Sequence, residues 1–146
     1  MSASEQFLSV SEEREIVEAI QQAEKNTSGE IRVHLEDLSK QPPLERAKEV
    51  FLSLEMHKTI ARNGVLFYVS VLDHQFVILG DEGINKLVTP DFWNSTKDIV
   101  ISHFKSGQNK QGLVNGILKA GEELKRLFPY CEVTDEDELS NEISRG

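Results

Sequence analysis

Apolar residues recur at intervals of three and four in two early segments of the chain, which is the spacing of one helix face. The first segment opens with Ser9 and Glu12, a capping-box pair that satisfies backbone N–H groups at a helix start. The second begins at Pro43, a residue suited to the first turn of a helix. These patterns predict helices over residues 10–25 and 43–54. Their apolar faces comprise Ile16, Val17, Ala19, Ile20 and Ala23 in one, and Leu44, Ala47, Val50, Phe51 and Leu54 in the other.

Three further segments carry strand patterns. Residues 31–35 alternate apolar and polar, as a strand with one buried face does. Residues 64–71 form a nearly continuous apolar run, which favours a central strand covered on both faces. Residues 76–79 follow a turn at Asp73 and His74, so the second and third strands are expected to form a hairpin.

The remaining part of the core region is helical in pattern. Apolar residues at helical spacing predict one helix that begins near Phe92 and ends at Gly107, and another over residues 113–128 that ends before Pro129. A right-handed crossover makes the first two strands parallel, and the hairpin makes the third antiparallel to the second. With helices on both faces, the predicted fold class is α/β, a three-layer αβα sandwich with a small mixed central sheet.

Length, charge and cysteine content limit the kinds of partner that this protein is expected to have. The chain has 146 residues, about one domain's worth, and a net charge of −9 that repels nucleic acid and anionic membranes. Residues 1–6 lack the basic and apolar regions of a leader, and no apolar run approaches the roughly 20 residues of a membrane span. Cys131 is the only cysteine, so no intrachain disulfide is possible. We therefore expect a cytoplasmic protein with no nucleic-acid or membrane partner.

Short catalytic signatures are missing from the sequence. No Gly-x-Ser-x-Gly elbow, phosphate-binding glycine loop or His-Glu-x-x-His pattern is present. His57, in the loop before the second strand, is the one histidine we would consider as an acid or base. The alternative is that it has no chemical role, since no perturbed environment is evident.

Several segments, taken in order, resemble the TPM-domain family. The resemblance spans residues 7–128 and rests on residues 27–33, 62–66, 77–84 and 104–107 and on the pair Gly112 and Leu113. It implies an αβα sandwich, bound calcium in some members and a reported acid phosphatase activity in plant members. One departure is that the aspartate that opens the family's Asp-x-x-x-x-Leu-Ser pattern is missing before Leu8 and Ser9. The chain reads as a stand-alone TPM-like domain over residues 1–128 with an acidic tail over 129–146.

Oxygen-bearing side chains cluster where the predicted strands begin and end. The hairpin places the end of the third strand beside the start of the second, and parallel pairing places the start of the first strand on the same rim. Carboxylate and amide oxygens are what calcium and magnesium prefer, and the resemblance favours calcium. We therefore expect a divalent-cation site whose ligands come from Glu30, Asn63, Asp81, Glu82 and Asp91. The competing interpretation makes Asp81 and Asp91 helix caps and Glu30 a solvated strand residue.

The expected function is thus a divalent-cation-binding domain whose loops are ordered by the metal. One alternative is a metal-dependent acid phosphatase, which the resemblance suggests and the missing arginine clamp disfavours. Another is a protein-interaction module that uses the tail, where six acids accompany one base. We expect the tail to be loosely packed, although Asp137 is a candidate to fold back onto the rim as a further ligand.

Overall fold

A four-stranded mixed sheet forms the middle layer of the molecule, with strand order β3-β2-β1-β4. The computed structural model describes residues 2–130 and 138–146. Along the chain the elements are α1 (Ala3–Gln6), α2 (Val10–Glu24), β1 (Glu30–Glu36), α3 (Pro43–Ser53), the 3-10 turn η1 (Met56–Lys58), β2 (Gly64–Ser70), β3 (Gln75–Gly80), α4 (Glu82–Asn85), α5 (Asn94–Lys105), α6 (Asn109–Leu127) and β4 (Ser144–Arg145).

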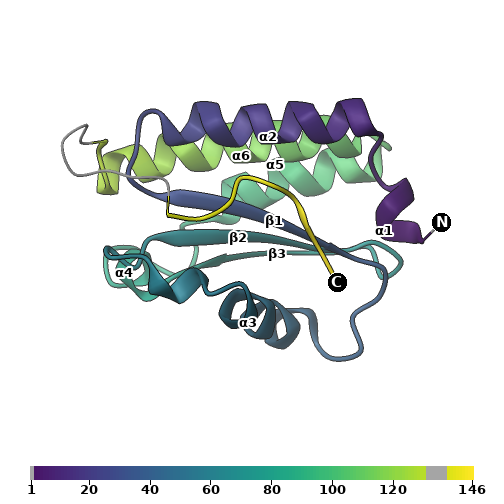
Figure 1. The fold of residues 1–146 in the computed structure, drawn as a ribbon, viewed down its shortest axis with the longest axis horizontal. Helices are drawn as coiled ribbons and strands as arrows, with labels where there is room; N and C mark the ends of the chain where they lie inside the picture. The colour runs from purple at the N-terminus through teal and green to yellow at the C-terminus, as the bar shows by residue number, and fades with distance from the viewer. Residues whose placement is uncertain (1, 131–137) are drawn as a thin grey trace.

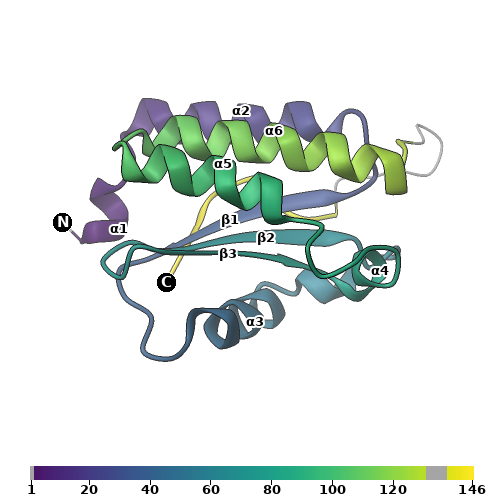
Figure 2. The same ribbon diagram turned by 180° about the vertical axis from the view of Figure 1, so that it is seen from behind.

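The helices divide between the two faces of the sheet. Figure 1 shows α2, α5 and α6 packed as one layer over one face and α3 with the short turn η1 under the other, and the reverse view in Figure 2 agrees. The fold is therefore the α/β sandwich that the order of elements predicts. The long helices begin and end within one or two residues of their predicted bounds at α2 and α3, and Gly107, at a φ of +77°, follows α5 as expected.

Strand pairing is also as predicted from connectivity. β1 and β2 are parallel, with Glu30 opposite Gly64 and Glu36 opposite Ser70, whereas β2 and β3 are antiparallel. Every residue of β2 is buried, which confirms its central position. The face of the sheet under α2, α5 and α6 carries the larger apolar core, and the face over α3 carries a smaller one around Met56, Leu66 and Tyr68.

One prediction about burial is wrong. β1 was expected to have one solvated face, but six of its seven residues are buried and only Arg32 is intermediate. In the described part of the tail, residues 138–146 lie along β1 and end as β4, which pairs with β1 in parallel, and none of these residues is buried. The tail covers one edge of β1, which contributes to the burial of that strand. Cys131 and Asp137 lie outside the described residues.

Candidate functional site

Three strand ends meet at one edge of the sheet. Glu30 and Gly64 begin β1 and β2 and are paired in register. Asp81 follows β3, and its backbone N–H donates to the Gly64 carbonyl over 2.9 Å. Asn63 precedes β2, and its carbonyl accepts from the Glu30 N–H over 3.3 Å. The strand order therefore brings Glu30, Asn63 and Asp81 together in the backbone, with exposed fractions of only 3%, 1% and 6%.

The Asp81 carboxylate is held by an arginine rather than left open. The Arg62 guanidinium donates from Nε to Oδ2 and from Nη2 to Oδ1, both over 2.9 Å, and from Nη1 to the exposed Glu82 carboxylate over 3.0 Å. Hydrogen bonding to Asp81 raises the pKa of Arg62. Asp81 Oδ1 also accepts from the Glu82 N–H over 2.7 Å, so Asp81 is the N-cap of α4. The interpretation of Asp81 as a helix cap is correct, and any cation here shares the carboxylate with Arg62.

Arg62 reaches Asp81 because its backbone is left-handed, with a φ of +51°. The turn is closed by the Gly83 N–H, which donates to the Arg62 carbonyl over 2.9 Å. A Cβ at Gly83 would lie 2.5 Å from that carbonyl oxygen and nearer still to the Ala61 oxygen. Gly83 is therefore required by the close approach of two backbones.

Glu30 and Asp81 lie in one row across the sheet, with Gly64 between them. The row faces α3 and η1, because the space a Gly64 side chain would take borders the Met56 carbonyl oxygen at 3.2 Å and the Leu139 side chain. Glu30 Oε1 accepts from the Leu139 N–H over 2.6 Å, which fastens the start of the described tail to the rim. Glu30 and Asp81 thus flank Gly64 in the sheet, and the Met56 carbonyl borders the space above it.

The Asn63 side chain has a different neighbour. Its Nδ2 donates to Ser28 Oγ over 3.3 Å, and its backbone N–H donates to Thr59 Oγ1 over 3.3 Å. Its Oδ1 is buried and accepts no hydrogen bond within residues 2–130 and 138–146. A buried amide oxygen without a donor costs about 1–3 kcal/mol, so this atom is an unsatisfied hard oxygen within the predicted ligand set.

Asp91 and His57 lie outside the strand ends, in a turn and in η1. Asp91 is exposed in the turn before α5, where its Oδ1 accepts from the Thr89 hydroxyl. It does not cap α5, which begins at Asn94. His57 is half-buried in η1, and its Nδ1 has no hydrogen-bond partner among the described residues.

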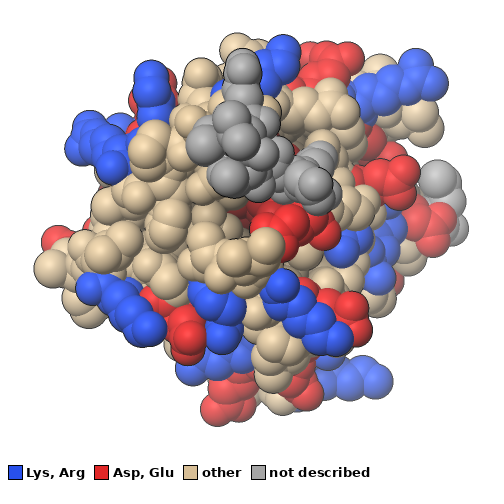
Figure 3. Space-filling view, turned by 60° about the vertical axis from the view of Figure 1, so that its left-hand side comes forward, with Lys and Arg blue, Asp and Glu red and all other residues tan. Residues whose placement is uncertain are grey.

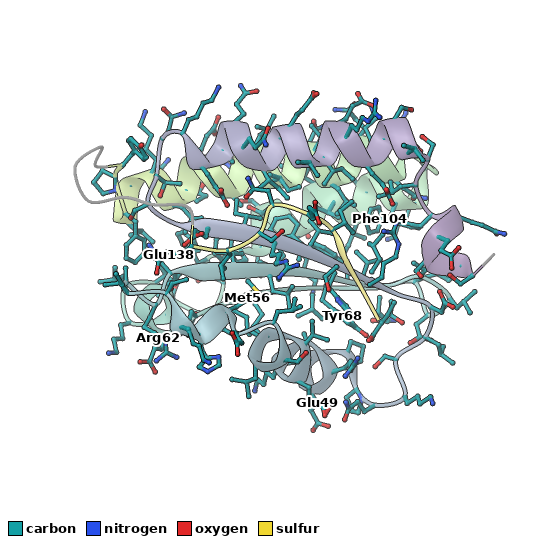
Figure 4. The ribbon with its side chains drawn as sticks, in the orientation of Figure 1. Glu49, Met56, Arg62, Tyr68, Phe104 and Glu138 are labelled. Atoms are coloured by element: carbon teal, nitrogen blue, oxygen red, sulfur yellow. The ribbon has the colours of Figure 1, made fainter. Side chains whose placement is uncertain are left out.

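The described chain holds no group of three or more His, Cys, Asp or Glu side chains placed to hold a metal ion. The strand-end face in Figure 3 carries acidic and basic side chains interspersed, so it is not a one-sign surface. Arg62 and Glu138 lie toward this end of the molecule in Figure 4, and Glu138 Oε2 accepts from the Ile60 N–H over 3.2 Å. A cation bound here would draw on Glu30, Asn63 and Asp81, with Glu82 at the outer side.

Sequence reasoning missed a second polar cluster at the opposite end of β1. Glu36 is 5% exposed and accepts from Arg46 of α3, with 2.9 Å and 3.1 Å from Nε to its two oxygens. The Tyr68 hydroxyl also donates to Glu36, and His34 Nε2 lies 3.3 Å from Glu36 Oε1. His34 Nδ1 lies 3.0 Å from Ser144 Oγ of β4. The alternation of Glu30, Arg32, His34 and Glu36 on one face was the available signal, but it was interpreted as a solvated face.

The pKa values in this cluster follow from burial and hydrogen bonding. Burial alone would raise the pKa of Glu36, but hydrogen bonds from Arg46, Tyr68 and His34 outweigh it and lower the pKa to about 2. Burial, aided by the hydrogen bond to Glu36, raises the pKa of Tyr68 to about 12. Burial lowers the pKa of His34 despite the nearby Glu36 carboxylate. A neutral His34 therefore donates from Nε2 to Glu36 and accepts the Ser144 hydroxyl at Nδ1.

Comparison with known proteins places the chain in a family. Residues 1–123 match the TPM domain, and the chain belongs to this family. The BA42 protein of the psychrophilic bacterium Bizionia argentinensis, solved by NMR, is 54% identical, with a TM-score of 0.90 and 96% of each chain covered. The N-terminal domain of a P. gingivalis protein is 19% identical, with a TM-score of 0.68 over 82% of this chain and 78% of that chain, which shows the fold alone. A comparison with curated proteins found no match.

Among the described helices none combines the length and the apolar character that crossing a bilayer requires.

Proposed function

We propose that this TPM domain binds a divalent cation, calcium in preference to magnesium, at the strand-end rim. The observation that carries the proposal is the buried Oδ1 of Asn63, which accepts no hydrogen bond in the described chain although it lies beside Glu30 in the backbone. A cation would satisfy this oxygen. Calcium suits the position better than magnesium because it accepts six to eight oxygens in flexible geometry.

Arg62 sets how strongly a cation binds. Its guanidinium pairs with both Asp81 and Glu82, so its one positive charge offsets part of the negative charge of the rim. A divalent ion must compete with this charge or use Glu30 and Asn63 together with backbone carbonyls. We therefore expect modest affinity that increases when the positive charge of Arg62 is removed.

The test is a calcium titration of isotope-labelled protein followed by NMR. The expected result is saturable shifts at Glu30, Asn63 and Asp81, and an Asn63→Ala variant that binds at least about tenfold more weakly. Glu55→Gln is the matched control, because Glu55 is an exposed acid whose ion pair, among residues 2–130 and 138–146, is with Lys58 across 3.0 Å. Asp81→Ala is a poor probe, since it removes a helix cap as well as an ion pair. Shifts that are absent, or equal in Asn63→Ala and wild type, would reject the rim site.

A metal-dependent phosphatase is the second candidate, and one cavity favours it. A space of about 220 Å³ near the rim is lined by Arg32, Lys58, Thr59 and Glu138, among others. The Nε of Arg32 is buried and has no hydrogen-bond partner in the described residues, so it is a donor available to a phosphoryl oxygen. Hydrolysis of a phosphate ester with and without calcium or magnesium tests this. Activity that persists in Arg32→Met would assign the activity elsewhere.

The proposal also includes a cytoplasmic location, which a single cysteine fits, because no intrachain disulfide can form.

A further inference from the structure

The open edge of β1 is covered by the chain's own last residues. Residues 138–146 run beside β1 in Figure 1 and end as β4, which is parallel to β1. The ladder between the two strands comprises only two residue pairs, His34 with Ser144 and Leu35 with Arg145. The Gly146 N–H adds one bond to the Leu35 carbonyl over 3.1 Å. β1 has seven residues, so a longer strand could pair with more of this edge than β4 does.

Each of the last four residues, 143–146, makes its own side-chain contact or close approach at the β1 edge. Ile143 packs against the main apolar core, and Ser144 Oγ pairs with His34 Nδ1 over 3.0 Å. Arg145 forms an ion pair with Glu13 of α2. A Cβ at Gly146 would lie 2.8 Å from His34 Nε2 and nearer still to Glu36 Oε1, so a larger residue requires these side chains to move. The four positions therefore favour an aliphatic, a hydroxyl, a basic and a glycine residue in that order.

Space for a larger occupant exists on both sides of β4. A cavity of about 500 Å³ lies on the α2 side and is lined by Val10, Arg14, Val17 and Ile143, among others. Another of about 520 Å³ lies on the α3 side and is lined by Asp37, Lys40, Arg46 and Gly146, among others. Successive side chains of an extended peptide point alternately to the two sides of a sheet, so these cavities flank the line that a docked strand follows.

Few interactions hold residues 143–146 on the β1 edge. Short ladders with partly exposed contacts open at low free-energy cost compared with the core of a sheet. The side chains of Arg145 and Glu13 are 31% and 29% exposed, which reduces the worth of their ion pair. The β1 edge and the cluster of His34 and Glu36 therefore belong to the stable core of the sheet. Residues 143–146 are the segment that can dissociate from it.

We propose that the β1 edge is a strand-addition site for an extended peptide of another protein, parallel to β1, with the order aliphatic, hydroxyl, basic and glycine. Main-chain hydrogen bonds to a sheet edge supply affinity in such complexes, and side-chain pockets supply specificity. Residues 143–146 are the occupant in cis and compete with the incoming strand. Two acidic residues of α2 beside the edge, Glu13 and Glu18, favour a basic residue at the position that Arg145 takes in cis.

The test uses the full isotope-labelled chain and an unlabelled nine-residue peptide with the sequence of residues 138–146 as the probe. The expected result is saturable NMR shifts at His34, Leu35 and Glu36, together with shifts of Ser144 and Arg145 as β4 is displaced. A peptide carrying Gly146→Val should bind at least about tenfold more weakly. The proposal is overturned by unchanged β1 signals at about 1 mM peptide, or by equal binding of the two peptides.

Two protein variants separate displacement from nonspecific binding. Arg145→Ala removes the ion pair to Glu13, so the wild-type peptide should bind about threefold or more tightly to this variant. Arg126→Ala is the matched control, because Arg126 is 77% exposed and its ion pair in the described part of the chain is with Glu123, at 4.0 Å. Equal peptide affinity in Arg145→Ala and Arg126→Ala would show that β4 does not compete. A concentration-dependent dimer with exchanged β4 strands would assign the edge to a second copy and refute the proposal.

Discussion

Replacing Glu36 by glutamine tests whether the buried polar cluster stabilises the fold. The folded pKa of about 2, against an ordinary value of 4.5, corresponds to a stabilisation of about 3 kcal/mol at neutral pH. Because the folded pKa is depressed, this stability is present above about pH 4.5 and is lost as the pH falls toward 2. Glu36→Gln keeps the shape of the side chain but removes the charge that Arg46 and Tyr68 hydrogen-bond.

The assay is urea unfolding at pH 7 and at pH 2.5. We expect Glu36→Gln to lose about 3 kcal/mol at pH 7, a fall in Tm of roughly 6–12 °C, and most of the difference from wild type to vanish at pH 2.5. Glu49→Gln is the control, since Glu49 is 57% exposed and lies 3.8 Å from the same Arg46. Its loss should be within about 0.5 kcal/mol. A loss below about 1 kcal/mol in Glu36→Gln, or one independent of pH, would refute the reasoning.

Three other variants or conditions follow from the same contacts. In urea unfolding, Gly83→Ala should lower the free energy of unfolding by about 2 kcal/mol or more, because its Cβ would lie 2.5 Å from the Arg62 oxygen. Gly107→Ala, whose Cβ would meet open space, should lower it by only about 1 kcal/mol. Tyr68→Phe should cost about 1–3 kcal/mol and move the acid unfolding midpoint upward, since Glu36 loses a donor. Wild type should lose stability above pH 10, toward the Tyr68 pKa of about 12, and Tyr68→Phe should not, by circular dichroism.

The sheet could be predicted because short, continuous stretches of sequence determine its strands and their pairing. The unbroken apolar run of β2 and the hairpin at Asp73 and His74 fix the central strands, and handedness fixes the parallel pair. The meeting of Glu30, Gly64 and Asp81 at one edge then follows from register alone.

The side chains at that edge could not be predicted in the same way. Arg62 reaches Asp81 through a left-handed backbone, which no pattern of apolar residues encodes. The position of Asp91 depends on the turn before α5, and tertiary packing sets the path of that turn. Strand order is therefore enough to predict where the rim lies. Predicting which side chains interact there also requires the loop conformations.

The polar cluster was missed because its cover is distant in sequence. His34 and Glu36 alternate with apolar residues, as solvent-facing residues do, but α3, β4 and Tyr68 of β2 lie against them. β4 spans two residues, too few to show a period. The Arg46 that pairs with Glu36 lies ten residues later, beyond a turn at Pro42 and Pro43, a spacing with no regular signature.

Calcium titration of the labelled full chain is the most direct measurement of whether the rim holds a cation. We expect saturable shifts at Asn63 and Glu30 that are lost in Asn63→Ala, retained in Glu55→Gln, and strengthened when Arg62→Gln frees Asp81. The contradicting result is a spectrum at Asn63 and Glu30 that calcium leaves unchanged at about 10 mM in both wild type and Arg62→Gln.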